Sequence, residues 1–193
     1  GADEALTDNV KAHIGQVDEA EFRNPRLLER RINRLITDAV QVLGYYHCEW
    51  SVDLSLEKVV IELTPGAPVL LLEPDIQLIG PVTKMAVFRD IINNNPLIAG
   101  EQLDHSKYDA LKKALMQKAQ GLGFFEAVYQ KSELLIDVHN NSAKIRLILE
   151  SGERYHFGDV TFEGSQLSEE FLNSIVPFKK NAPYERDLLA SFR

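Results

Sequence analysis

The chain has 193 residues, 45% of them hydrophobic and 26% charged, a composition ordinary for a globular protein. Its formal net charge of −8 argues against a nucleic-acid partner, which would require a basic patch or stripe. No apolar run approaches the ~18 residues that a membrane helix needs. The single cysteine, Cys48, excludes an internal disulfide and a cysteine-based metal site.

The chain opens with two predicted amphipathic helices. Apolar residues recur on one helical face from Leu6 to Val17. Asn24 is suited to the N-cap of a second helix and Pro25 to its first position. Arg30, Arg31 and Arg34 are expected on the solvated face of that helix, and Gly44 to end it as a C′ glycine. Its apolar stripe comprises Leu28, Ile32, Leu35, Ile36, Ala39, Val40 and Leu43.

A pair of strands is expected after this helix. Residues 48–54 alternate between apolar and polar types, which is typical of a half-buried strand, and residues 59–63 form a second apolar run. Residues 55–58 are expected to form the turn between them. The segment 64–68, Thr-Pro-Gly-Ala-Pro, then breaks the chain. The order is therefore helix, helix, strand, strand.

The next stretch predicts a complete unit in the order β-α-α-β-β. Its strand runs over residues 69–79 with an interruption near Pro74, and its first helix ends before Pro96. Asp104 or Ser106 could cap the second helix, which ends at Gly121–Gly123. Strands follow at 127–138 and 144–149, joined by a turn at 139–142. The helix faces comprise Val87, Phe88, Ile91 and Ile92 in the first helix and Tyr108, Leu111, Leu115, Ala119 and Leu122 in the second.

Two markers recur along the chain and predict a tandem repeat. Gly44-Tyr45-Tyr46 and Gly123-Phe124-Phe125 begin 79 residues apart, and Asp75–Gly80 and Asp159–Gly164 begin 84 apart. After residue 152 a third unit is expected to begin, with a strand over 155–162, a helix over 169–176 and another from Tyr184. The predicted domains are 1–68, lacking a first strand, 69–151, complete, and 152–193, truncated. The chain is thus expected to be cut at both ends.

The repeat resembles the POTRA (polypeptide-transport-associated) domain of the BamA/TamA superfamily of outer-membrane assembly factors. The resemblance is strongest over Ser151–Gln166 and Val176–Lys179, and it includes Leu43–Tyr46 and Thr64–Val69. It fits the outer-membrane subunit of the translocation and assembly module better than the sister subunit BamA. It implies an α+β fold of tandem β-α-α-β-β domains, each with a three-stranded mixed sheet and two helices on one face.

The resemblance also implies a function and partners. Such domains are periplasmic arms of outer-membrane proteins of Gram-negative bacteria, and an exposed strand edge can accept a partner strand. The implied partners are a TamB-like inner-membrane-anchored periplasmic protein and the arm's own membrane barrel. Nascent outer-membrane proteins are a further partner that the resemblance leaves open. Candidate edge residues are Cys48, Trp50, Val52, Leu54, Tyr129, Leu134 and Ile136. The short segments at 64–68 and 151–152 predict a semi-rigid arm, so a spacer without client binding stays open, as does an arm of a related assembly or secretion barrel.

Six residues are predicted to be structural: Gly44, Tyr45, Gly80, Gly123, Phe124 and Gly164. Glycine permits the positive φ of a helix end, and the next ring can cover the end of the core. The alternative is a peptide-binding aromatic. No nucleophile elbow, histidine pair or carboxylate pair stands in a catalytic motif, so neither an enzyme, a cofactor nor a metal is expected.

Overall fold

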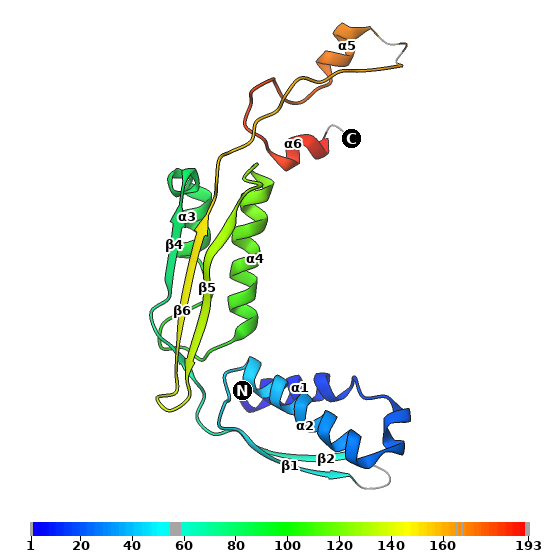
Figure 1. The fold of residues 1–193 in the computed structure, drawn as a ribbon, viewed down its shortest axis with the longest axis vertical. Helices are drawn as coiled ribbons and strands as arrows, with labels where there is room; N and C mark the ends of the chain where they lie inside the picture. Colours follow the sequence, from blue (N-terminus) through cyan, green and yellow to red (C-terminus); the bar gives the residue numbers. More distant parts are fainter. Residues whose placement is uncertain (1, 55–58, 165, 167, 192–193) are drawn as a thin grey trace. The chain divides into compact units, whose positions relative to one another are not determined.

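The computed structural model describes residues 2–54, 59–164, 166 and 168–191 (Figure 1). It divides into two compact units that interleave along the chain: unit 1 is Gly1–Pro74, Leu97–Asp109 and Leu134–Ile145, and unit 2 is Asp75–Pro96, Ala110–Glu133 and Arg146–Arg193. Helices, an antiparallel strand pair and a four-stranded sheet with parallel pairs confirm the predicted α+β class. The domain boundaries at residues 68 and 151 stay a prediction. No described helix has the length and apolarity needed to span a membrane.

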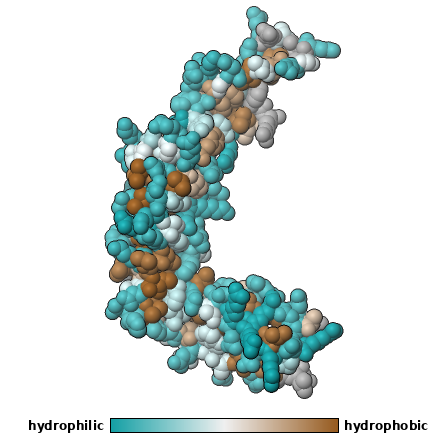
Figure 2. Space-filling model, viewed as in Figure 1, coloured by the Kyte–Doolittle hydropathy of each residue, from teal (hydrophilic) through white to brown (hydrophobic). Residues whose placement is uncertain are grey.

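Unit 1 begins with the two predicted helices, α1 (Ala2–Ile14) and α2 (Pro25–Val42), joined through the short 3-10 helix η1 (Glu19–Arg23). The N-cap is confirmed, because the Asn24 side chain accepts a hydrogen bond from the Leu27 N–H. Arg30, Arg31 and Arg34 are exposed, and Figure 2 shows a largely hydrophilic surface over these helices. The buried face of α2 comprises Leu28, Ile32, Ile36, Ala39 and Val40.

The predicted strand pair follows as β1 (Glu49–Leu54) and β2 (Val59–Thr64), which are antiparallel with Glu49 opposite Thr64. Alternate residues of β1 are exposed and half-buried, as the sequence pattern predicts. The inner side chains of both strands pack against a core built from α1, α2 and Tyr45. The turn expected at residues 55–58 lies outside the described residues.

Unit 1 also contains β3 (Leu70–Leu71), which pairs in parallel with the first two residues of β6 (Ser142–Glu150). The helix α4 (His105–Gly121) begins in this unit. Asp104 is its N-cap, because the Asp104 carboxylate accepts hydrogen bonds from both the backbone N–H and the hydroxyl of Ser106. This settles the two alternatives that the sequence left for the cap.

Unit 2 carries β4 (Asp75–Ile79), the 3-10 helix η2 (Pro81–Lys84), α3 (Ala86–Asn93), the rest of α4 and β5 (Val128–Asp137). β4 pairs in parallel with residues 146–150 of β6, and β5 pairs with β6 as well. The sheet therefore has four strands where three were predicted. The predicted first strand is divided into β3 and β4 by residues 72–74, where Pro74 lacks the N–H of a regular ladder.

The C-terminal part of unit 2 forms two short helices, α5 (Glu169–Ser174) and α6 (Arg186–Ser191), where the sequence predicted helices. The predicted strand over residues 155–162 is wrong: the described residues there form only an isolated bridge between His156 and Pro183. The physical reason lies in strand pairing. The corresponding strand β4 is held by β6, and no strand equivalent to β6 follows α6 among the described residues.

Candidate partner-binding edges

The first candidate edge is the outer edge of β1. Among the described residues β1 pairs only with β2, so the backbone N–H and C=O groups on its other side can accept a further strand. Its exposed side chains are Glu49, Ser51 and Asp53, while Trp50 is anchored inward because its indole Nε1–H donates to Asn33 Oδ1 over 2.7 Å. β1 is thus a regular edge whose outward face is acidic.

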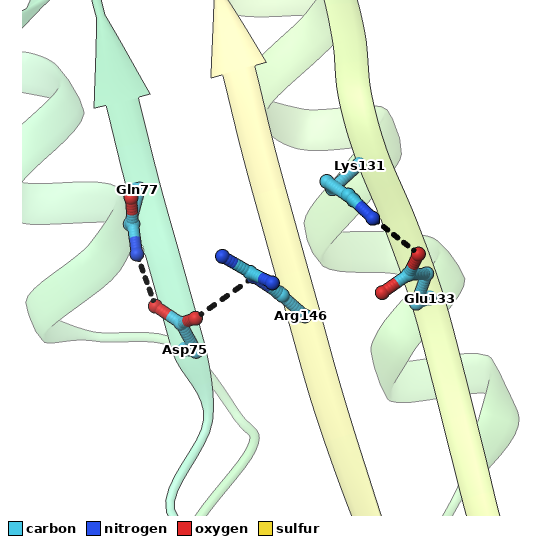
Figure 3. Close-up of polar contacts among 5 residues, drawn as sticks. All are labelled: Asp75, Gln77, Lys131, Glu133 and Arg146. Carbon is cyan, nitrogen blue, oxygen red and sulfur yellow. Dashed lines mark hydrogen bonds and ion pairs between the residues drawn. The ribbon is translucent and has the colours of Figure 1, made fainter.

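The second candidate edge is β5, which pairs with β6 among the described residues. Its alternation of exposed and half-buried residues is broken by three successive exposed residues, Gln130–Ser132. Lys131 Nζ forms an ion pair with Glu133 Oε1 over 2.9 Å along this strand (Figure 3). Irregularity along an edge strand hinders the addition of another strand. β5 is therefore a poorer docking edge than β1.

A further ion pair lies between the strands on the other side of β6. Arg146 Nε on β6 is 3.2 Å from Asp75 Oδ2 on β4, without hydrogen-bond alignment, and the Gln77 amide donates to Asp75 Oδ1 over 2.7 Å (Figure 3). Both partners of the ion pair are partly exposed, which limits its contribution to stability. This edge of β6 is occupied by β4.

The predicted edge side chains lie on the inner side of their strands. Cys48 is buried, and Trp50, Val52 and Leu54 are half-buried against the core of unit 1. Tyr129, Leu134 and Ile136 of β5 are also half-buried, and the Tyr129 hydroxyl donates to the Lys112 carbonyl oxygen over 2.8 Å. Their use in partner binding stays a prediction. If a strand were added at either edge, these side chains would contact its core-facing residues. Its outward-facing residues would contact the exposed residues of β1 or β5 instead.

Cys48 is a poor candidate for thiol chemistry. Its side chain is buried, and burial, together with the neighbouring Glu49 carboxylate, raises the pKa of the thiol. A raised pKa lowers the fraction of reactive thiolate at neutral pH. Among the described residues no group of three or more histidine, cysteine, aspartate or glutamate side chains could hold a metal ion.

Each Gly-aromatic triplet divides its two rings between two tasks. The first ring of each, Tyr45 and Phe124, is 4% and 0% exposed and belongs to the core. Gly44 and Gly123 precede these rings at φ +80° and +88°, a conformation that favours glycine. Of the other predicted structural glycines, an added Cβ at Gly80 would meet Ser151 Oγ, whereas one at Gly164 would lie in open space.

The end of α2 forms a set of contacts that we call the first joint. The Gly44 carbonyl oxygen accepts a hydrogen bond from the Val69 N–H over 2.8 Å, and the Leu43 carbonyl oxygen accepts one from Gln102 Nε2 over 2.5 Å. The Val69 carbonyl in turn accepts from the Leu103 N–H over 2.8 Å. Carbonyls that the helix end leaves unpaired are thus satisfied by the chain that follows.

The end of α4 repeats this arrangement in the second joint. The Gly123 carbonyl oxygen accepts from the Tyr155 N–H over 2.8 Å, and the Leu122 carbonyl oxygen accepts from Arg154 Nε over 2.8 Å. The Tyr155 carbonyl accepts from the Tyr184 N–H over 2.9 Å. The backbone pattern matches that of the first joint, with a guanidinium where the first joint has an amide.

The second ring of each triplet completes its joint. The Tyr46 hydroxyl lies 3.0 Å from His105 Nε2 in the first joint. Phe125 packs edge-on against Tyr155 and Tyr184 in the second, with ring centroids 5.4 and 4.9 Å apart. Sequence reasoning found the triplets but missed this role, because the partner residues lie 30 to 60 positions away in the chain.

Burial and local partners shift the titration of a few groups around the joints. Burial raises the pKa of Tyr46 and lowers that of His105, against the opposing effect of Asp109 and Asp104. The neutral histidine is therefore favoured in the first joint. In the second joint the Tyr155 hydroxyl donates to Glu126, and this hydrogen bond raises the pKa of Tyr155.

Comparison with known proteins adds a family match for the N-terminal third. Residues 1–65 match the family model of the first POTRA domain of TamA. Among solved structures, POTRA domains 3–5 of Haemophilus influenzae BamA show 20% identity and a TM-score of 0.48, covering 86% of this chain and 66% of that one. POTRA domains 1–3 of Omp85 from Anabaena show 13% identity and a TM-score of 0.37, with coverages of 85% and 68%. The chain thus spans just under two thirds of the BamA fragment.

Proposed function

Since residues 1–65 match the family model of the first POTRA domain of TamA, we propose that this chain is the periplasmic docking arm of an outer-membrane protein assembly and translocation factor. The family match is the observation that carries the proposal. The arm belongs to an outer-membrane protein of a Gram-negative bacterium and links its membrane barrel to a TamB-like inner-membrane-anchored partner. Nascent outer-membrane strands are a second class of ligand.

The β1 edge is the docking position within the POTRA domain. It presents unpaired backbone groups, and backbone pairing binds strands with little demand on their sequence. In a strand added beside β1, apolar and basic side chains should alternate. One set of its side chains would lie beside half-buried Trp50 and Val52 and should be apolar. The other would lie beside Glu49 and Asp53 and should include lysine or arginine, since opposite charges across strands are favourable.

A proline scan along Glu49–Leu54 tests this docking mode. The N–H groups of alternate residues point toward β2 and away from it. Proline at outward positions should weaken binding of the periplasmic part of the TamB-like partner by about 3- to 10-fold, the loss expected for one net hydrogen bond, without lowering the melting temperature. Proline at inward positions should lower the melting temperature instead. Unchanged affinity for every variant that melts normally would overturn strand addition at β1.

The two joints favour a second candidate function, a spacer that sets the distance between barrel and partner without binding clients. Each joint ties a helix end to the following chain by two hydrogen bonds rather than by a flexible linker. The proline scan separates the two functions, because a pure spacer keeps its partner affinity in every variant that folds. Changes in joint length, by contrast, would impair a spacer even with both strand edges intact.

A further inference from the structure

The solvent-facing side of α2 concentrates positive charge in an acidic chain. Residues 22–34 contain five arginines and a single acidic residue, Glu29, whereas the whole chain has a net charge of −8. Arg26, Arg30 and Arg34 recur at i, i+4 and i+8, so they share one face of the helix. We call these three residues the arginine stripe. All three are exposed, and the stripe is about 12 Å long at the rise of an α-helix.

The charge of the stripe is only partly neutralised. Arg34 Nε lies 3.9 Å from Asp38 Oδ2, and both side chains are largely exposed, so this pair is weak. Arg31, next to the stripe, is paired with a glutamate of η1 over 3.2 Å. Within the described part of the chain, no acidic side chain forms an ion pair with Arg26 or Arg30. Their guanidinium groups are therefore available to an anionic partner.

The repeat fold does not require arginine at these positions. When Gly44 is aligned with Gly123, the stripe corresponds to His105, Asp109 and Lys113 of α4. The helix α4 is the second helix of its own repeat, as α2 is of the first, and it forms without a row of like charges there. The arginine stripe is therefore an addition to the fold and not a condition for it.

Two large apolar side chains are exposed beside the stripe. Phe22, just before α2, is 46% exposed, and Leu27, which directly follows Arg26, is 60% exposed. Basic residues beside exposed phenylalanine and leucine are typical of protein surfaces that lie at the boundary between lipid and water. There the guanidinium groups bind phosphates and the apolar side chains enter the layer of acyl chains. A partner that supplied only carboxylates would leave Phe22 and Leu27 in water.

We propose that the arginine stripe, together with Phe22 and Leu27, binds the surface of a membrane that contains anionic phospholipids. The helices α1 and α2 cover one face of β1 and β2 (Figure 1), and the opposite face of β1 exposes Glu49 and Asp53. An anionic surface repels these carboxylates, so contact is confined to the α2 side of unit 1 and the β1 edge stays open. This inference does not rest on docking at β1, and either of the two can fail alone.

Cosedimentation with vesicles tests the association. The 193-residue chain should bind vesicles of phosphatidylglycerol and phosphatidylcholine in equal parts, and it should not bind vesicles of phosphatidylcholine alone. Binding should be lost between about 0.1 M and 1 M salt, because the Debye length falls from about 10 Å to about 3 Å. No binding to the anionic vesicles at the lower salt concentration would overturn the proposal. Binding of polyglutamate without binding of these vesicles would overturn it in favour of an acidic polypeptide.

Two double variants test whether the stripe is the binding surface. Arg26→Gln with Arg30→Gln should raise the apparent Kd for anionic vesicles about 10- to 30-fold, since each basic residue near such a surface contributes roughly fivefold. The matched control, Arg89→Gln with Lys113→Gln, removes the same charge from exposed positions of unit 2 and should change the Kd little. Equal weakening by both double variants would show that net charge alone drives binding and would overturn the assignment to α2.

A polarity-sensitive fluorophore tests the orientation of unit 1 on the membrane. The label is attached to Leu27→Cys on the α2 side or to Ser51→Cys on the opposite face, and the native Cys48 is buried. Anionic vesicles should shift the emission of the label at position 27 to shorter wavelength and leave that of the label at position 51 unchanged. Equal shifts at the two positions, or no shift at position 27, would overturn the proposal.

Discussion

The two joints share a backbone design but differ in their side chains. In each, a glycine at positive φ turns the chain out of a helix, and the last helix carbonyls accept hydrogen bonds from the segment that follows. The first joint adds the amide of Gln102 and the Tyr46–His105 pair, which are neutral. The second adds the Arg154 guanidinium and packed rings. The comparison teaches that the repeat preserves the backbone geometry of the joint and allows its chemistry to vary.

The two rings of each triplet should differ in how much they contribute to folding stability. Tyr45→Ala and Phe124→Ala should each lower the free energy of unfolding by about 3–5 kcal/mol, because each empties a core position. Tyr46→Ala and Phe125→Ala should cost no more than about 1.5 kcal/mol. Denaturant unfolding measures both, with Trp50, the single tryptophan, reporting on unit 1. Equal losses for the two rings of a triplet would contradict the division of tasks.

The glycines test the shared backbone design. An added Cβ at Gly44 would lie 2.8 Å from the Leu103 carbonyl oxygen, and one at Gly123 would lie 2.8 Å from Tyr184 Cβ. Alanine at either position should cost about 1–3 kcal/mol from its backbone conformation, and the contact adds to this. Gly100→Ala is the matched control, because Gly100 has φ +83° but nothing within 4 Å of an added Cβ. Losses no larger than that of Gly100→Ala would show that the close contacts do not matter.

The side chains that bond the helix carbonyls test the difference between the joints. Arg154 donates to the carbonyl oxygens of both Leu122 and Tyr184, whereas Gln102 donates to that of Leu43 alone. Arg154→Ala should therefore cost about 1.5–3 kcal/mol and Gln102→Ala about 0.5–1.5 kcal/mol, as charged and neutral hydrogen bonds differ. Amide hydrogen exchange at Tyr155 and Val69 should rise in the same order. The reverse order would contradict this ranking of the joints.

The smallest expected effect is a pH dependence confined to the first joint. Burial lowers the pKa of His105 in the folded chain, so the unfolded chain binds this proton more readily. The stability from the neutral histidine is present above about pH 6.5 and is lost as the pH falls below it. His105→Asn should reduce the loss of stability between pH 7.5 and 5.5. Comparison of this variant with wild-type protein at each pH isolates the contribution of His105. A pH dependence of stability equal to that of wild-type protein would show that His105 makes no such contribution.

The sequence predicted the elements well where the signal was local. The Asn24 cap, the turn at Gly44 and the alternation in β1 follow from neighbouring residues, and the structure confirms them. The strand expected at residues 155–162 failed because a strand exists only where a partner strand pairs with it. The inward orientation of Trp50 and Tyr129 depends on α2 and α4, which no local pattern could locate.

Photocrosslinking in the complete protein, in its own membrane, tests the proposed docking arm most directly. Photoreactive residues at Ser51 and Asp53 lie on the face beside the β1 edge, and one at Arg30 lies on the solvated face of α2 as the control. We expect the β1 positions to crosslink to the TamB-like partner and the Arg30 position to do so far less. Equal crosslinking from all three positions, or none from β1, would contradict docking at this edge.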